Sequence, residues 1–574
     1  MNLYSMRAVI MAGVLALGAS ATSTAAAGTA GDTGATVARF ERFSYQGRPQ
    51  ENVRPRNGEF VNPILSGYYP DPSITRVGDD YYLVNSSFTN FPGLPVFHSM
   101  DLVNWAQIGN ALDRPGQVDF TGVRASQGIY APDISYHDGT FYIVTTCSSC
   151  PGGTGNFVIT ATDPAGPWSQ PVTIRGLQGI DPSLVWDGDK VYVVYNNAPE
   201  GQPRYDGHRA IWIAELDPRT LQFAGTPRVL VDGGVVPANR PIWIEGPHIF
   251  KKDGYYYLTC AEGGTADNHS EVVFRANAIT GPYRPGPVNP ILTQRDLDPK
   301  RANPVTTAGH ADFVQTQNGQ WWAVFLATRP YPGNFYNIGR ETFLLPVDWK
   351  AGWPLILEQG RTVPFVVRKP ALPPQAPAPV PTSGSFAYVD EFDAPLSAAW
   401  IGIRIPQAPL YTVERGELVL RAGGPLGDLR SVPAFVGRRQ QHHIATASTV
   451  VNFASKRDGD RAGLVAMQND DNHMFLGLAR VDGKDVVALY RTEGGRETLV
   501  ASRPAASRRV ELVMDMNGGQ ASYRYRDADV TTTLADHVDI RFLSTQKAGG
   551  FVGVVIGPYA VSGRDVAGAG RHRD

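Results

Sequence analysis

Five similar segments recur along the N-terminal part of the chain, and they constrain its fold more than any other feature. Each contains an aromatic-rich run after a turn of Gly, Asp or Asn: DDYYLV (79–84), GTFYIV (139–144), DKVYVVY (189–195), GYYYLT (254–259) and GQWWAVF (319–325). Shortly before each run, one polar residue opens a short apolar segment. These residues, 62, 48, 64 and 65 positions apart, are Asp71, Asp133, Asp181, Glu245 and His310. Strand–turn–strand units at this period predict a five-bladed β-propeller with four-stranded blades.

The polar residue of each unit is expected on the strand nearest the propeller axis, where the innermost strands line a central channel. Five such side chains would then converge on one mouth of the channel. A single Asp-Pro-Ser sequence is typical of an ordinary turn, and Asp133 in APDI fits a blade edge equally well. The recurrence of acidic or imidazole groups at equivalent positions favours a site. Prolines on both sides of Asp71 restrict its backbone and fix where its carboxylate points.

Composition and turn signals give the rest of the organisation. An apolar run followed by small residues predicts a signal peptide over 1–27, too short to be a membrane span, and residues 28–59 form an N-terminal extension. The propeller is expected over 60–365, followed by a proline-rich linker over 366–385. Residues 386–574 show short strands without helical periodicity, which predicts an antiparallel β-sandwich. The chain is therefore expected to be all-β, and the sandwich is a binding module, a brace or a lid.

Charge and cysteine content exclude several classes of protein. The formal charge is −2, and the densest basic run, GRRQQHH (437–443), is short, which argues against nucleic-acid binding. We expect a secreted or periplasmic protein. In such an oxidising compartment the CSSC motif favours packing or a disulfide over zinc or redox chemistry, since no second pair of zinc ligands follows. The pairing is left open among Cys147, Cys150 and Cys260.

Three of the five converging residues are carboxylic acids: Asp71, Asp181 and Glu245. Hydrolysis of a glycosidic bond needs one protonated carboxyl group to assist the leaving oxygen and one ionised carboxylate. A third carboxylate nearby raises the pKa of the acid by like-charge repulsion. Aromatic side chains suited to sugar faces are Phe88, Phe91, Tyr130 and Trp243. These residues predict a glycosidase, with an inactive carbohydrate-binding propeller as the non-enzymatic alternative.

The sequence resembles glycoside hydrolase family 43, in the xylosidase and arabinofuranosidase group with a C-terminal β-sandwich. Five ordered motifs carry the resemblance: NPILSGYYPDPSI, GIYAPDISYHDGTFYIV, GIDPSLVWDGD, WIEGPHIFKKDGYYYLTCAEGGT and GRETFLLPVDW. The segment FVGRRQQHH (435–443) also occurs in that group. The resemblance extends from residue 60 to the C-terminus, apart from the linker. It implies a five-bladed propeller enzyme that acts with inversion, followed by a concanavalin-like β-sandwich.

The resemblance also implies roles for individual residues. Asp71 in PDPSI resembles the general base that activates water, and Glu245 in IEGPH resembles the general acid. Asp181 in IDPSL resembles the residue that raises the pKa of the acid and orients it. The expected substrate contacts, from the resemblance or from their aromatic character, are Phe88, Phe91, Tyr130, His310 and Arg340.

The expected activity is release of xylose from the non-reducing ends of xylooligosaccharides. The alternative is an α-L-arabinofuranosidase, or both activities in one pocket, because the two sugars present similar hydroxyl patterns. No cofactor is expected to be required and no metal ligand is predicted, while a calcium ion near His310 is left open. The expected partner is an oligosaccharide, with neither nucleic acid nor a membrane, and the oligomeric state is left open.

Overall fold

The computed structural model describes residues 36–153 and 155–563. These residues are almost entirely β, with one short helix, α1 (Thr545–Ala548), and three single turns of 3-10 helix at Pro151–Gly153, Pro237–Asn239 and Arg541–Leu543. No described helix has the length and apolar character needed to cross a membrane. The predicted signal peptide, residues 1–27, lies outside the described residues.

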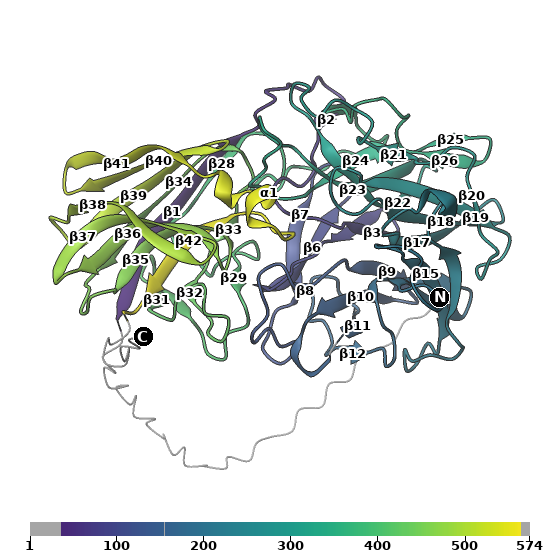
Figure 1. Cartoon of the computed structure of the whole chain (residues 1–574), viewed down its shortest axis with the longest axis horizontal. Helices are drawn as coiled ribbons and strands as arrows, with labels where there is room; N and C mark the ends of the chain where they lie inside the picture. The colour runs from purple at the N-terminus through teal and green to yellow at the C-terminus, as the bar shows by residue number, and fades with distance from the viewer. Residues whose placement is uncertain (1–35, 154, 564–574) are drawn as a thin grey trace, which may run out of the picture. The chain divides into compact units, whose positions relative to one another are not determined.

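Five antiparallel sheets form the blades of the propeller (Figure 1). Blade I contains β3 (Ser73–Val77), β4 (Asp80–Val84), β6 (Gly93–Ser99) and β7 (Ala106–Leu112). Blade II contains β9 (Asp133–His137), β10 (Thr140–Ser148), β11 (Gly155–Ala161) and β12 (Val172–Thr173), with β8 (Gly128–Ile129) added to β10. Blade III contains β13 (Ile180–Asp187), β14 (Lys190–Asn197), β15 (Ala210–Leu216) and β16 (Arg228–Asp232).

Blades IV and V complete the set. Blade IV contains β17 (Glu245–Lys252), β18 (Tyr255–Glu262), β19 (Ser270–Ala276) and β20 (Arg284–Pro285), with β21 (Leu292–Thr293) added to β19. Blade V contains β22 (Thr306–Gln315), β23 (Trp321–Thr328) and β24 (Glu341–Pro346). The predicted five-bladed, all-β architecture is confirmed, although the fifth sheet has three strands instead of four.

The segment that precedes blade I lies beside β24, the last strand of blade V. Strands β3, β9, β13, β17 and β22 contact one another in this order, and β22 contacts β3 again. Next to β24, the backbone N–H of Ile64 donates to the carbonyl of Thr342 at 2.9 Å, and Leu65 forms a bridge to Thr342. Backbone hydrogen bonds therefore join the two ends of the propeller into a ring.

Two sheets pack around a shared apolar core to form the C-terminal β-sandwich. The first contains β30 (Tyr411–Glu414), β31 (Glu417–Arg421), β1 (Val37–Arg48), β34 (Ile444–Phe453), β39 (Arg509–Asn517), β40 (Gln520–Asp527) and β41 (Val530–Asp539), with β28 (Phe386–Asp390) paired to β1. The second contains β32 (Ala434–Phe435), β42 (Val555–Val561), β35 (Arg461–Asn469), β36 (Asn472–Val481), β37 (Lys484–Glu493) and β38 (Arg496–Pro504), with β33 (Arg438–Arg439) paired to β42.

Three short two-stranded ladders lie outside these sheets in the described part of the chain. Strand β2 (Glu59–Val61) pairs with β27 (Val366–Arg368), so the segment predicted as a linker begins with a strand on the propeller. The other two ladders are β5 (Asn90–Phe91) with β29 (Gly402–Ile403), and β25 (Asp348–Lys350) with β26 (Trp353–Leu355).

The N-terminal extension contributes a strand to the sandwich, which the sequence analysis did not predict. Strand β1 lies between β31 and β34, and in Figure 1 it is the purple strand among the green and yellow ones. Its apolar side chains alternate along the strand, and Phe40, Phe43 and Tyr45 are buried in the core. The alternation is interrupted by a register shift between Phe40 and Arg42. The pattern of a half-buried strand is thus present in the sequence, but its partners lie more than three hundred residues away.

The basic segment 435–443 packs against the propeller. The Nε atom of Arg439 donates to the carbonyl of Tyr68 at 2.9 Å. Its guanidinium lies 4.8 Å from the ring centroid of Tyr68 and 4.4 Å from that of Tyr69. Because Tyr69 stands two residues before Asp71, the sandwich fixes the stretch of chain that leads into the first polar residue of the repeat.

Candidate active site

Three innermost strands carry β-bulges at the polar residues of the repeat. The register of β13 against β14 shifts around Asp181, and that of β17 against β18 shifts between Glu245 and His248. The register of β22 against β23 shifts twice, and His310 lies within the second shift, between Gly309 and Asp312. A bulge takes residues out of the regular ladder and changes the direction of their side chains. The bulges therefore turn these side chains away from the alternation of an ordinary strand.

The backbone around the site is also unusual. The φ angle is +52° at Asp71, +54° at Asp181, +53° at His310 and +53° at Phe88. A non-glycine residue in such a strained conformation costs on the order of 1–3 kcal/mol, and it persists only where the surrounding structure enforces it. Aspartate tolerates this region better than most residues because its side chain is short and polar. The prolines on both sides of Asp71 restrict this backbone conformation further, and the conformation fixes the direction of the Asp71 carboxylate.

These residues meet in one buried pocket at the propeller axis. It is lined by Asp71, Phe88, Tyr130, Ala131, Ile180, Asp181, Glu245, Thr265, His310, Arg340 and Phe551. All three predicted catalytic carboxylates and four of the five predicted substrate contacts are in this set. The fifth, Phe91, pairs through β5 with β29 and is not among the lining residues.

Asp71 is buried among groups that favour its ionised form. Arg340 Nη1 donates to Asp71 Oδ1 at 3.2 Å, and Ser86 Oγ donates to Oδ2 at 2.5 Å. His310 Nδ1 lies 3.5 Å from Oδ1. Burial alone would raise the pKa of Asp71, but the charge of Arg340, followed by His310 and the Ser86 hydroxyl, holds it below its usual value. Asp71 is therefore a carboxylate that can accept a proton.

Asp181 and Glu245, in contrast, lie among groups that favour their protonated forms. Burial, followed by the charge of Asp71, raises the pKa of Asp181 to about 7. Burial, followed by the charges of Asp181 and Asp71, raises the pKa of Glu245 well above its usual value. The backbone N–H of Gly246 donates to Asp181 Oδ2 at 3.2 Å, which places Asp181 beside the strand that carries Glu245. This pair retains a proton at neutral pH while Asp71 is ionised.

Gly246 leaves the space in which His310 packs beside the pair. A Cβ atom at Gly246 would lie 2.6 Å from His310 Nε2, and the φ angle of Gly246 is +56°. Any side chain here would displace the imidazole ring, so the glycine of the EGPH sequence is required by contact as well as by conformation. Burial lowers the pKa of His310 to about 4, and the ring is therefore neutral.

Phe551, from the sandwich, forms one wall of the pocket. Its ring is stacked on Phe88, with the centroids 6.5 Å apart, and meets Tyr130 edge-on at 6.0 Å. The Arg340 guanidinium lies 5.4 Å from the Phe551 ring centroid. Of the three roles left open for the sandwich, this contact supports that of a lid. The sequence around Phe551, GGFVGVV, carries no motif that links it to a site formed by a different fold.

Asp133 lies in a second buried cluster, with His248 and Asp312. His248 Nδ1 is 3.4 Å from Asp133 Oδ1 and 3.6 Å from Asp312 Oδ1. Burial disfavours a charge on the imidazole, but the two carboxylates, Asp312 first, raise the pKa of His248 to about 9. His248 is therefore an imidazolium between two carboxylates. The cluster ties β9, β17 and β22 together at the axis of the propeller.

This cluster predicts a loss of stability at alkaline pH. The folded pKa of His248 is about 9, above its ordinary value of 6.5. Its contribution is thus complete below pH 6.5 and is lost as the pH rises through about 9, which amounts to about 3 kcal/mol. Urea unfolding across this range should show the decline in the wild type and a flatter profile in His248→Gln. Equal slopes in the two proteins would contradict the role of His248.

The sequence left open whether a calcium ion lies near His310. Ca²⁺ prefers six to eight oxygen ligands. Close to His310 the structure places the Asp71 carboxylate and the Arg340 cation, which do not form an oxygen-rich cage. In the second cluster, ligand atoms of Asp133, His248 and Asp312 lie within 4.8 Å of one another, but the His248 imidazolium already lies between the two carboxylates and offsets part of their charge.

The disulfide lies in blade II. Cys147 and Cys150 are bonded to each other, and Cys260 is a buried free cysteine on β18. The structure thus gives the pairing that the spacing left open.

The pocket of this five-bladed propeller contains aromatic side chains, one ionised carboxylate and a carboxyl pair that retains a proton. These are the groups that a glycoside hydrolase needs. Comparison with known proteins gives the same class. Residues 60–354 match the family described as Glycosyl hydrolases family 43. Residues 389–569 match the Beta xylosidase C-terminal Concanavalin A-like domain. The chain belongs to glycosyl hydrolase family 43, and it is a glycosidase that acts on carbohydrate.

Relatives that match almost the whole chain are named as an arabinofuranosidase or as a combined xylosidase and arabinosidase. A "Non-reducing end alpha-L-arabinofuranosidase" of Bacteroides ovatus is 39% identical over 89% of this chain and 92% of its own length. A "Xylosidase/arabinosidase" of Butyrivibrio fibrisolvens is 36% identical over 87% of this chain and 95% of its own. A solved family 43 structure from a capybara gut metagenome is 37% identical, with a TM-score of 0.84 over 92% of this chain and 100% of that one.

Proposed function

We propose that the protein is an exo-acting, inverting glycosidase that releases xylose from the non-reducing ends of xylooligosaccharides. The observation that carries this proposal is the opposed protonation of Asp71 and Glu245 within one pocket. Removal of a terminal sugar requires a pocket that is closed at one end, and the contacts of Phe551 with Phe88 and Tyr130 support such a wall.

The proposed reaction uses each carboxyl group once. Asp71 removes a proton from a water molecule, and the water oxygen attacks the anomeric carbon from the face opposite the leaving group. Glu245 gives its proton to the glycosidic oxygen as the bond from that oxygen to the anomeric carbon breaks. Asp181, beside the strand that carries Glu245, raises the pKa of this acid by its negative charge. Arg340 donates hydrogen bonds to Asp71 and Thr265, and its positive charge keeps the base, Asp71, ionised.

We predict a bell-shaped dependence of kcat/KM on pH. The acid limb should lie below the usual range of an aspartate, because the active form needs Asp71 ionised and its pKa is lowered. The alkaline limb should lie at neutral pH or above, because the active form also needs the proton of Glu245. Initial rates on a xylobiose substrate test both limbs. Activity that rises steadily into alkaline solution would contradict the acid role.

The alternative is α-L-arabinofuranosidase activity, alone or together with xylosidase activity. It is favoured by the names of two relatives, the alpha-L-arabinofuranosidase of Bacteroides ovatus and the xylosidase/arabinosidase of Butyrivibrio fibrisolvens. Release of nitrophenol from nitrophenyl β-D-xyloside and α-L-arabinofuranoside, followed by release of pentose from xylooligosaccharides, separates the two. A faster reaction on the arabinofuranoside would replace our substrate proposal, and no reaction on either would leave a carbohydrate-binding propeller.

We also propose that the protein works in the periplasm or outside the cell. The predicted signal peptide over 1–27 motivates this proposal, and the disulfide between Cys147 and Cys150 supports it, since disulfides persist in oxidising compartments. Fractionation of expressing cells, followed by the activity assay, tests it. Activity confined to the cytoplasm would contradict it.

A further inference from the structure

Two partly exposed side chains, Trp243 and Arg209, lie close to Glu245 outside the set that lines the pocket. Trp243 stands two residues before Glu245. Ile244 between them is buried in the core of blades III and IV, with 1% of its surface exposed. Trp243 itself has a φ angle of +50°, so it stands just outside the strand that begins at Glu245.

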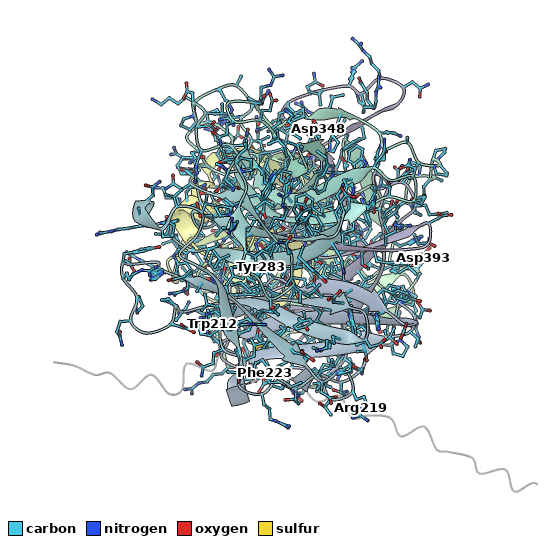
Figure 2. The ribbon with its side chains drawn as sticks, turned by 90° about the vertical axis from the view of Figure 1, so that its right-hand side faces the viewer. Trp212, Arg219, Phe223, Tyr283, Asp348 and Asp393 are labelled. Atoms are coloured by element: carbon cyan, nitrogen blue, oxygen red, sulfur yellow. A yellow bond between two sulfur atoms is a disulfide. The ribbon has the colours of Figure 1, made fainter. Side chains whose placement is uncertain are left out.

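Arg209 is stacked on Trp243. Its Cζ atom lies 4.1 Å from the centroid of the indole ring. The backbone N–H of Trp243 donates to the carbonyl of Gly207 at 2.8 Å, which joins the two loops that carry the pair. The other end of the Arg209 loop is fixed by Trp212, labelled in Figure 2, whose Nε1 donates to the carbonyl of Ala198 at 2.9 Å. The guanidinium is thus held in place by residues of blades III and IV.

The stack adjoins a wall of the pocket. A Cβ atom at Gly264 would lie 3.6 Å from Cδ1 of Trp243. The next residue, Thr265, lines the pocket and accepts a hydrogen bond from Arg340 at 2.8 Å. With φ angles of +72° at Gly264 and +75° at Gly207, both glycines adopt conformations that side chains disfavour, and neither adds a side chain beside the indole. The edge of the stack thus stays free of side chains from these two positions.

The Arg209 charge has no acidic partner in the described part of the chain. Its hydrogen bond is from Nη1 to the carbonyl of His208, at 3.1 Å, and no carboxylate oxygen of a described residue lies within 4.0 Å of its nitrogens. A guanidinium has five N–H donors in one plane, so several remain for a ligand. The charge also reaches Glu245: burial and the carboxylates raise the pKa of Glu245, and Arg340 and Arg209 oppose this rise.

We propose that Arg209, held over the ring of Trp243, binds the hydroxyl groups of the leaving group, and that the pair forms a leaving-group subsite. This inference rests on the proposed function, in which Glu245 protonates the glycosidic oxygen. A general acid must contact the oxygen that it protonates, so the departing sugar lies on the side of Glu245. Hydrogen bonds from a guanidinium to sugar hydroxyls are charge-assisted and stronger than neutral ones. Arg209 then orients the departing sugar and lowers the pKa of the acid beside it.

The test compares two substrates that differ only in the leaving group: xylobiose, which fills the subsite, and xylosyl fluoride, which leaves it empty. Arg209→Gln in the full chain should lower kcat/KM for xylobiose about tenfold to a hundredfold. It should leave kcat/KM for the fluoride within about twofold of the wild type. Its alkaline limb on xylobiose should move to higher pH, because a cation that lowers the pKa of Glu245 is gone, whereas Arg209→Lys should retain the limb.

The matched control is Arg219→Gln, the same substitution on the same blade. Arg219, labelled in Figure 2, lies in the turn after β15 with 89% of its side chain exposed. This substitution should leave kcat/KM for both substrates, and the pH profile, unchanged. Equal losses on xylobiose and the fluoride in Arg209→Gln, or no loss on either, would overturn the subsite while leaving the proposed function intact. A wild type that cleaves neither compound would instead overturn the proposed function, and the subsite with it.

Discussion

Asp71→Asn should lose about 10³-fold in kcat on both aryl and sugar substrates, while the protein stays folded. The loss has one cause: asparagine cannot take a proton from the attacking water. Asparagine also tolerates the left-handed backbone found at this position, where φ is +52°, so the turn should survive. The amide can still accept the hydrogen bond from Ser86. Nitrophenol release and the midpoint of thermal unfolding, measured on the same preparation, separate chemistry from folding.

Asp79→Asn is the control for this prediction, because Asp79 lies eight residues further on and is exposed. It should retain wild-type activity. An Asp71→Asn protein that is folded and fully active would eliminate Asp71 as the base. A protein whose melting temperature drops sharply would show instead that the Asp71–Arg340 contact is needed for the fold.

Glu245→Gln should lose activity in proportion to how much the leaving group needs a proton. For xylobiose, whose leaving group is a sugar hydroxyl, we expect a loss of about 10³-fold in kcat/KM, and for a dinitrophenyl xyloside a loss of about tenfold or less. The alkaline limb of the pH profile should disappear for the dinitrophenyl substrate, since glutamine has no proton to lose. Asp181→Asn supplies the comparison: it removes the charge that raises the pKa of Glu245, so the alkaline limb should move to lower pH.

Equal losses on the two substrates in Glu245→Gln would contradict the acid role. If the alkaline limb stays in place in Glu245→Gln, another group must titrate there. Asp181, with a pKa raised to about 7, would then be the first group to examine.

The repeat in the sequence predicted the propeller because each blade uses the same local signals. A turn, an aromatic strand and a preceding polar residue are features of neighbouring residues, and five copies fix the blade number. The same logic located Asp71, Asp181 and Glu245, since equivalent positions in a repeat converge on the axis of a ring. The prediction needed no knowledge of long-range contacts apart from the closure of the ring itself.

What the sequence could not predict depends on contacts between distant segments. Phe551 reaches the pocket only because the sandwich packs against the propeller, and β1 joins a sheet whose other strands follow the propeller in the chain. Phe91 is expected as a sugar contact from its aromatic character, but its strand β5 pairs with β29 and it is not among the residues that line the pocket. His248 carried no signal of its own, because its role depends on carboxylates from two other blades.

In the proposed reaction, Asp71 directs water to the anomeric carbon on the face opposite a leaving group protonated by Glu245. Proton NMR during the first minutes of hydrolysis of a β-xyloside measures this directly, because the first-formed anomer is seen before mutarotation equilibrates it. We predict α-xylose as the initial product. Initial β-xylose would contradict it, since retention requires a covalent intermediate and would make one of these carboxylates a nucleophile.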